Sequence, residues 1–166
     1  MPDRVPAAKP NRPRNPDAPP KQERPRDELG RPLPLGAEGR LAMEDFDSFP
    51  LERNHELGIE HFNAGRFFPA HEAWETSWKQ AKGTPDAEFF KGLSQLGAGY
   101  VHLQRANAHG AFTLLRRAAR RIAAYPGEHR GVDTEAVSGA ALADADAVER
   151  AYRDGRPIPE VTPPHI

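Results

Sequence analysis

The sequence has no cysteine among its 166 residues, which excludes disulfide bonds, thiol catalysis and metal sites built on thiolates. It also lacks an apolar stretch of the ~20 residues that a membrane-spanning helix needs, and no apolar run lies near its N-terminus. The formal net charge is −1, so no excess of positive charge indicates a nucleic-acid or membrane partner. We therefore expect a cytoplasmic protein that binds neither membranes nor nucleic acid.

Proline is abundant but unevenly spread, because 10 of the 18 prolines precede Leu35. A segment so rich in proline cannot continue helices or central strands, and its apolar content is too low for a core. We therefore predict a disordered tail over residues 1–47, a folded domain over residues 48–155 and a loose C-terminal tail over residues 156–166. The arginines of the first tail also fit a basic arm for an acidic partner, as an alternative to a solvated tail.

The folded part carries the capping residues and breakers that are typical of helices. Ser48 and Asn107 are expected N-caps, Asp133 or Thr134 is expected to open the last helix, and Gly65 is an expected helix terminator. Alternation of apolar and polar residues is nowhere long enough to predict a strand, and the short loops favour antiparallel neighbours. The sequence thus predicts an all-α fold, a compact bundle of about five helices near residues 48–64, 69–81, 85–106, 107–125 and 134–153.

The second expected helix carries the best candidate site. At 100° per residue, His71, Trp74 and Trp78 share a stripe, and Glu75 lies about 40° from His71. Ionisable groups beside aromatic rings are placed where desolvation and hydrogen bonding shift their protonation. His71 and Glu75 could hold a divalent metal, or Glu75 could orient the imidazole for proton transfer, while Glu72 lies nearer the helix rim. The structural alternative is a hydrogen-bonded core histidine.

The third expected helix offers a polar face that could complete this site. Gly92, Gln95, Gly99 and His102 fall within about 80° of arc on that helix. Glycine inside a helix costs about 1 kcal/mol relative to alanine, so these glycines indicate that another helix or a ligand approaches closely. If the neighbour is the second helix, Gln95 meets His71 inside the bundle. The alternative is a buried network with a purely structural role.

Several short groups of residues in the first four expected helices resemble the pattern of a known family. They are Phe62-Asn63-Ala64-Gly65, Ala70-His71-Glu72, Trp74-Glu75, Trp78, Phe89, Gly92-Leu93, Gln95, His102, and Asn107 with Gly110-Ala111. Together they make the stretch from Leu51 to Tyr125 resemble the small all-helical bacterial and archaeal domains of unknown function numbered 309. The resemblance implies the helical fold and marks the positions of His71, Glu75 and Gln95 as characteristic. It implies no activity, substrate or cofactor.

The sequence departs from the pattern of that family in three places. Lys91 stands where glutamine is usual, Ser94 stands where an aliphatic residue is usual, and the Pro-rich tail lies outside the pattern.

We interpret the chain first as a binding module whose polar pocket lies between aromatic walls. The candidate pocket residues are His71, Glu72, Trp74, Glu75, Trp78, Gln95 and His102. Its ligand is unknown, and a small molecule, a protein or a second copy of the chain are open partners. A second hypothesis is a metal-assisted hydrolase that uses His71 and Glu75 as ligands of a divalent metal. Since a catalytic metal usually needs about three protein ligands, the third would have to be Glu72, His102 or a residue of the first helix such as His55 or His61. A third hypothesis is structural, with the polar cluster joining the second and third helices.

Overall fold

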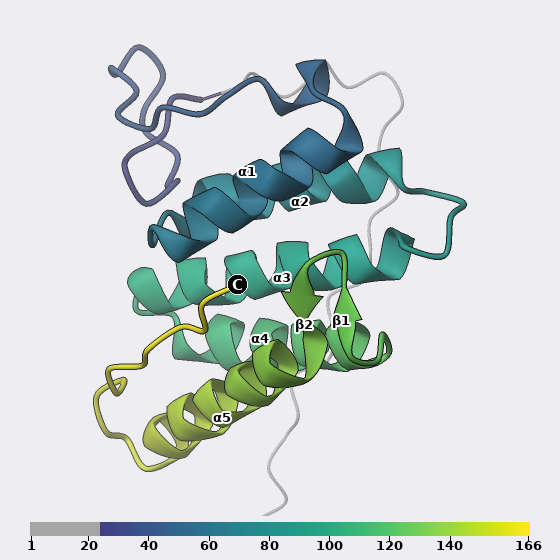
Figure 1. Cartoon of the computed structure of the whole chain (residues 1–166). Helices are drawn as coiled ribbons and strands as arrows, with labels where there is room; N and C mark the ends of the chain where they lie inside the picture. The colour runs from purple at the N-terminus through teal and green to yellow at the C-terminus, as the bar shows by residue number, and fades with distance from the viewer. Residues whose placement is uncertain (1–23) are drawn as a thin grey trace, which may run out of the picture.

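The computed structural model describes residues 24–166, and five α-helices dominate them. The helices are α1 (Leu51–Asn63), α2 (Phe67–Gln80), α3 (Ala87–Gln104), α4 (Ala108–Ala123) and α5 (Thr134–Arg153). Each helix packs against the next in sequence, so α3 lies between α2 and α4 (Figure 1). The predicted all-α fold is confirmed. In the described part of the chain, no helix is long and apolar enough to span a membrane.

Two of the predicted helix caps are present, and one prediction was wrong. The side chains of Asn107 and Asp133 accept hydrogen bonds of 3.0 Å from the backbone N–H groups of Gly110 and Ala136, three residues on. Ser48, by contrast, ends a short 3₁₀ helix, η1 (Phe46–Ser48), and its hydroxyl donates to a backbone carbonyl before that helix. The N-cap position of α1 is instead Pro50, whose side chain has no acceptor, so this helix begins without a side-chain cap.

The glycines of α3 allow both of its neighbours to approach closely. A Cβ at Gly92 would lie 2.9 Å from Cβ of Arg121, and one at Gly99 would lie 2.7 Å from a methyl group of Leu115, both on α4. On the opposite side, a Cβ at Gly97 would lie 3.0 Å from the backbone nitrogen of His71 on α2. The predicted close approach of helices is therefore present, with two of these glycines facing α4 and one facing α2.

A small hairpin between α4 and α5 was not predicted. Its strands, β1 (Glu128–His129) and β2 (Val132–Asp133), pair antiparallel in the described residues. Arg130 and Gly131 between them have φ angles of 47° and 77°, and two left-handed residues in a row are typical of a type I′ turn. Strands of two residues are too short to show alternation, so the sequence pattern gave no signal for them.

Residues 24–47, part of the predicted tail, form hydrogen bonds of their own and contact the bundle in the described structure. The predicted disorder of residues 1–23 lies outside the described residues. The carboxylate of Asp27 accepts hydrogen bonds from the backbone N–H groups of Leu29 and Arg31 and closes a tight loop. Gly30 in that loop lies directly on the ring of Phe68, where a Cβ would be 2.3 Å from Cδ2. Local hydrogen bonds and this contact thus order residues that composition alone assigns to a tail.

The C-terminal tail was predicted to be loose but packs back onto the bundle (Figure 1). Ile158, Val161 and Ile166 lie against the core. The side chain of Asn63, at the end of α1, donates to the carbonyl of Ile166 at 2.7 Å and accepts from its N–H at 2.8 Å. This correction has a simple reason: the prolines keep the segment extended, and its apolar residues still bury surface.

Candidate functional site

The candidate site lies at the border between the buried and exposed faces of α2. Trp74, about 60° from His71 toward the core, is fully buried. Glu75 and Glu72 lie about 40° and 100° from His71 on the other side, toward solvent. The side chains of His71, Glu72 and Glu75 are 25%, 35% and 33% exposed. All three groups are thus partly desolvated and still reachable from solvent.

The orientation of the His71 ring is set by α3. Its Nδ1 lies 2.9 Å from the backbone carbonyl oxygen of Ser94. A carbonyl can only accept, so this contact is a hydrogen bond when Nδ1 carries the ring proton. The Ser94 hydroxyl lies 2.9 Å from the same nitrogen and can donate to the carbonyl of His71 at 3.3 Å. Nδ1 is therefore engaged, and Nε2 is left facing outward.

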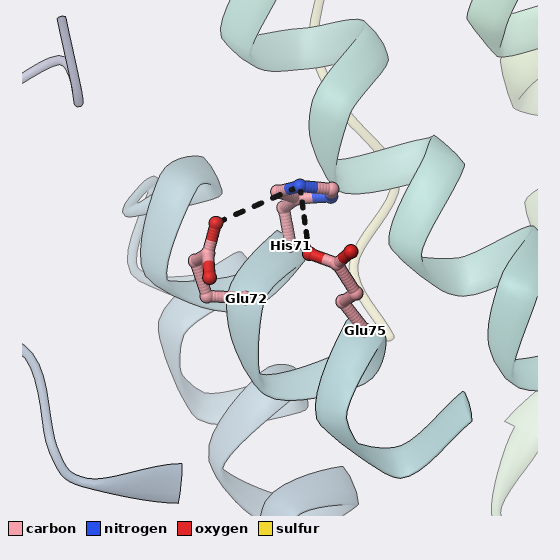
Figure 2. Close-up of side chains that lie close together, drawn as sticks. All are labelled: His71, Glu72 and Glu75. Carbon is pink, nitrogen blue, oxygen red and sulfur yellow. Dashed lines mark ion pairs between the residues drawn. The ribbon is translucent and has the colours of Figure 1, made fainter. Parts of the chain in front are cut away.

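Nε2 of His71 faces the carboxylates of Glu72 and Glu75 (Figure 2). The distances from this nitrogen are 3.8 Å to Oε1 of Glu72 and 3.7 Å to Oε2 of Glu75. A charged N–H···O bond would be ~2.7–2.9 Å long, so neither carboxylate is hydrogen-bonded to the ring. One ligand atom from each residue lies within 4.8 Å of the others. The three atoms therefore surround a common space.

The charge in this cluster is that of two carboxylates beside one imidazole. Lys79 lies on the next turn, with its ammonium 3.9 Å from Oε1 of Glu75.

In an octahedral or tetrahedral complex with bonds of ~2.1 Å, neighbouring ligand atoms are about 3.0–3.4 Å apart. The two separations from Nε2 of His71 exceed this spacing by less than 1 Å, and the two carboxylate oxygens lie within 4.8 Å of each other. Rotations of the glutamate side chains would therefore bring the three atoms into coordinating positions. The arrangement is chemically suited to a divalent cation.

Gln95 does not reach this cluster, contrary to the sequence-based expectation. Its side-chain oxygen accepts a hydrogen bond of 3.1 Å from the guanidinium of Arg121 on α4. Gln95 shares a face with Gly92 and Gly99, and that face packs on α4 rather than on α2. Gly97 is the residue of α3 that meets α2, and it lies about 200° around the helix from Gln95. Gln95 therefore points away from α2 and from His71.

His102 also lies outside the three-residue cluster. Its Nδ1 is 3.0 Å from the side-chain nitrogen of Asn107, so it accepts a hydrogen bond there. Burial is the largest effect on the pKa of His102 and lowers it from its ordinary value, and the positive charge of Arg105 lowers it further. Glu72, and not His102, is therefore the third candidate ligand in the described structure.

The two tryptophans do not form the predicted walls. Trp74 points into the core, where its indole N–H donates to Nδ1 of His55 at 3.0 Å. Trp78 is partly buried at the end of α2, with the ammonium groups of Lys82 and Lys91 about 5 Å from its ring centre. The aromatic ring beside His71 is that of Phe68, with ring centres 6.1 Å apart.

His55 is an unanticipated buried link between the core and the hairpin. Its Nε2 lies 2.9 Å from the carbonyl oxygen of Arg130, so Nε2 donates while Nδ1 accepts from Trp74. This pattern requires the neutral imidazole with its proton on Nε2. Burial, the largest effect, lowers the pKa of His55. The bonding of both nitrogens removes His55 from the set of candidate metal ligands.

Residues 55–114 match the model of a family described as "Domain of unknown function (DUF309)". The resemblance expected from the sequence is thereby confirmed over these residues. The matched range runs from within α1 to within α4 and includes His71, Glu72 and Glu75. No curated protein matches the chain, and no solved structure does.

Proposed function

We propose that this domain is a binding module whose ligand is a divalent metal cation, held by His71, Glu72 and Glu75. The observation that carries the proposal is the geometry of His71. Its Nδ1 donates to a backbone carbonyl, and its Nε2 and two carboxylate oxygens surround one space without bonding to one another. Metal-ligating histidines almost always donate their other N–H in this way, which fixes the ring and raises its basicity.

The rival explanation is a protonated His71 that forms an ion triad with the two glutamates. An imidazolium would be drawn to at least one carboxylate at hydrogen-bonding distance, about 2.7–2.9 Å. At 3.7 and 3.8 Å, Nε2 forms no hydrogen bond to either carboxylate, and the three groups leave between them the space that a metal ion would occupy.

The ligand atoms narrow the choice of metal. One imidazole nitrogen with carboxylate oxygens suits Zn²⁺, Mn²⁺ or Fe²⁺, whereas sites for softer ions use thiolates, which this chain lacks. Three protein ligands leave coordination positions open to water or to a further ligand.

The direct test is metal analysis of protein that is purified without an affinity tag, followed by competition titrations with Zn²⁺ and Mn²⁺. We expect one high-affinity site per chain, weakened by at least about tenfold in His71→Ala and in Glu75→Gln. Gln95→Ala is the matched control, because Gln95 contacts Arg121 and should bind metal as the wild type does. Equal affinity in the wild type and His71→Ala would overturn the proposal.

A metal-assisted hydrolase is a second candidate, favoured by a cavity of about 370 Å³ that Glu72 helps to line. A metal with open coordination positions beside such a cavity could activate a water molecule against a bound substrate. The check is hydrolysis of p-nitrophenyl acetate and p-nitrophenyl phosphate by metal-loaded protein. Activity that survives in His71→Ala would exclude the cluster as its source.

A purely structural role of the cluster is tested by stability in the presence of a chelator. The bond from His71 to the carbonyl of Ser94 joins α2 to α3, so His71→Ala should lower the free energy of unfolding by roughly 1–3 kcal/mol even without metal. If added metal stabilises only the wild type, the cluster binds metal as well as joining the helices.

A further inference from the structure

A cavity of about 370 Å³ adjoins the cluster of His71, Glu72 and Glu75 and has cationic side chains on one wall. Arg24 and Arg26 of the N-terminal segment form that wall, while Phe68 and Glu72 line the cavity from α2. Glu72 is therefore shared by the cavity and the candidate metal site. Whatever fills the cavity lies next to the cation.

The N-terminal wall is held in place by several contacts on α2 and α3. Gly30 packs on the ring of Phe68, as described above, and the guanidinium of Arg26 lies 5.0 Å from the centre of the same ring. The guanidinium of Arg105, at the end of α3, donates two hydrogen bonds of 3.0 and 3.2 Å to the carbonyl of Leu29. The cavity wall is thus fixed to the helices that carry the cluster.

The charges of this wall are not balanced within the described residues. Two acidic residues of the segment pair with other arginines, Asp27 with Arg31 at 2.6 Å and Glu28 with Arg40 at 3.5 Å. Arg24 and Arg26 each donate to a backbone carbonyl, of Leu33 and Gly30 respectively, and form no ion pair with a carboxylate of residues 24–166.

Each guanidinium has five N–H donors in a fork that matches carboxylate and phosphate oxygens. Donors of both arginines therefore remain available to a guest, and the cavity also offers the Phe68 ring as an apolar surface. An anionic group with an apolar neighbour fits this combination.

We infer that this cavity binds the anionic group, a phosphate or a carboxylate, of a small molecule whose other end reaches the metal at His71. The inference rests on the proposed metal site for the second contact, whereas the contact with Arg24 and Arg26 stands without it. The arginines neutralise the anion, and Glu72, once its charge is engaged by the metal, no longer repels it.

The test is calorimetric titration of the full chain with inorganic phosphate and, in parallel, with acetate, first in chelator and then with Mn²⁺ bound. We expect the Arg24→Gln/Arg26→Gln double variant to lose at least about tenfold in affinity for the preferred anion, as for the loss of charge-assisted hydrogen bonds. Arg120→Gln, an exposed arginine on α4, is the control and should bind as the wild type does. Binding of both anions that does not depend on Arg24 and Arg26 would overturn the inference.

A second variant separates this inference from the metal proposal. Glu72→Gln removes a negative charge from the cavity and a ligand from the cluster. In chelator it should therefore bind phosphate more tightly than the wild type, while its Mn²⁺ affinity falls. Unchanged Mn²⁺ affinity with tighter phosphate binding would contradict the metal site and retain the anion site.

Proximity of the two sites is measured by the ³¹P NMR line of phosphate on Mn²⁺-loaded protein. The line should broaden in the wild type and stay narrow in the double arginine variant, although Mn²⁺ remains bound to both. Equal broadening in the two proteins would place phosphate on the metal without the arginines and would overturn the inference.

Discussion

The backbone carbonyl of Ser94 lies 2.9 Å from Nδ1 of His71, and this contact decides which nitrogen of the ring is free. It links α3 to α2 at the point where a Cβ at Gly97 would meet the backbone of His71. The close helix packing and the free Nε2 are therefore two aspects of one arrangement.

Ser94→Ala should leave metal affinity close to that of the wild type. The backbone carbonyl that fixes Nδ1 is retained, and only the hydroxyl contact at 2.9 Å is lost. Competition titration with Zn²⁺ is the measurement, with His71→Ala as the variant that removes the ligand itself. A loss as large as about 10- to 100-fold in Ser94→Ala would show that the hydroxyl, and not the carbonyl, supports the ring.

Gly97→Ala should lower the free energy of unfolding by roughly 1–3 kcal/mol, because the new methyl group meets backbone atoms of α2 that cannot rotate away. Gly139→Ala is the matched control on the exposed face of α5, where a Cβ has no atom within 4 Å. The control should gain about 0.5–1 kcal/mol from helix propensity. Urea unfolding measures the free energy of unfolding of both variants. Stabilisation of both would contradict the tight contact between α2 and α3.

The buried His55 should make stability fall in mild acid. Burial lowers its pKa in the folded chain from the ordinary 6.5, so the unfolded chain takes up a proton at a higher pH than the folded chain does. The free energy of unfolding therefore decreases as pH falls from about 6.5 toward the folded pKa. His55→Gln can still accept from Trp74 and donate to Arg130 but does not titrate.

Urea unfolding at pH 7.5 and 5.5 measures this effect of His55. The difference between the two pH values should be smaller in His55→Gln than in the wild type. Identical differences would show that His55 does not titrate differently in the folded and unfolded chains.

Asp86, at the start of α3, should hold the hairpin of β1 and β2 in place. Its carboxylate accepts hydrogen bonds from Nε2 of His129 at 2.7 Å and from Nε of Arg130 at 2.6 Å. Burial acts to raise the pKa of Asp86, but these partners outweigh it and lower the pKa below the ordinary 3.8. The stabilisation is therefore complete at neutral pH and is lost in acid below about pH 3.8.

Asp86→Asn removes the negative charge from these two hydrogen bonds and should lower the free energy of unfolding by roughly 1–3 kcal/mol at neutral pH. Amide hydrogen exchange is the measurement, and it should become faster in residues 128–133. Exchange in the hairpin that matches the wild type would contradict the role of Asp86.

The helices could be predicted because their signals are local. The side chains of Asn107 and Asp133 bond to backbone groups three residues away, so the cap and the helix it starts are read from one short stretch. The two tails could not be predicted in the same way. Their order depends on distant partners, such as Ile166 on Asn63 and Gly30 on Phe68, which composition does not encode.

The same difference between local signals and contacts of distant residues applies to the candidate site. His71 and Glu75, at positions i and i+4, are brought together by one turn of helix, so their spacing alone predicts the pair. Glu72 lies about 100° from His71, and the turn of its side chain toward Nε2 is seen only in the structure. Gln95 was assigned to it wrongly because both α2 and α4 pack on α3, and the sequence does not tell which of them covers a given face. The carbonyl of Ser94 is a backbone group without a sequence signal. Arg24 and Arg26 were predicted only as part of a solvated tail or of a basic arm, because their contact with a cavity on α2 depends on the fold.

The central claim is that one divalent cation binds between His71, Glu72 and Glu75, and anomalous X-ray diffraction from a zinc-loaded crystal tests it most directly. The account predicts a single strong anomalous peak at ~2.0–2.2 Å from Nε2 of His71 and from one carboxylate oxygen of each glutamate. Nδ1 should keep its hydrogen bond to the carbonyl of Ser94. A peak bound elsewhere, or His71 and the glutamates without zinc between them, would contradict the account.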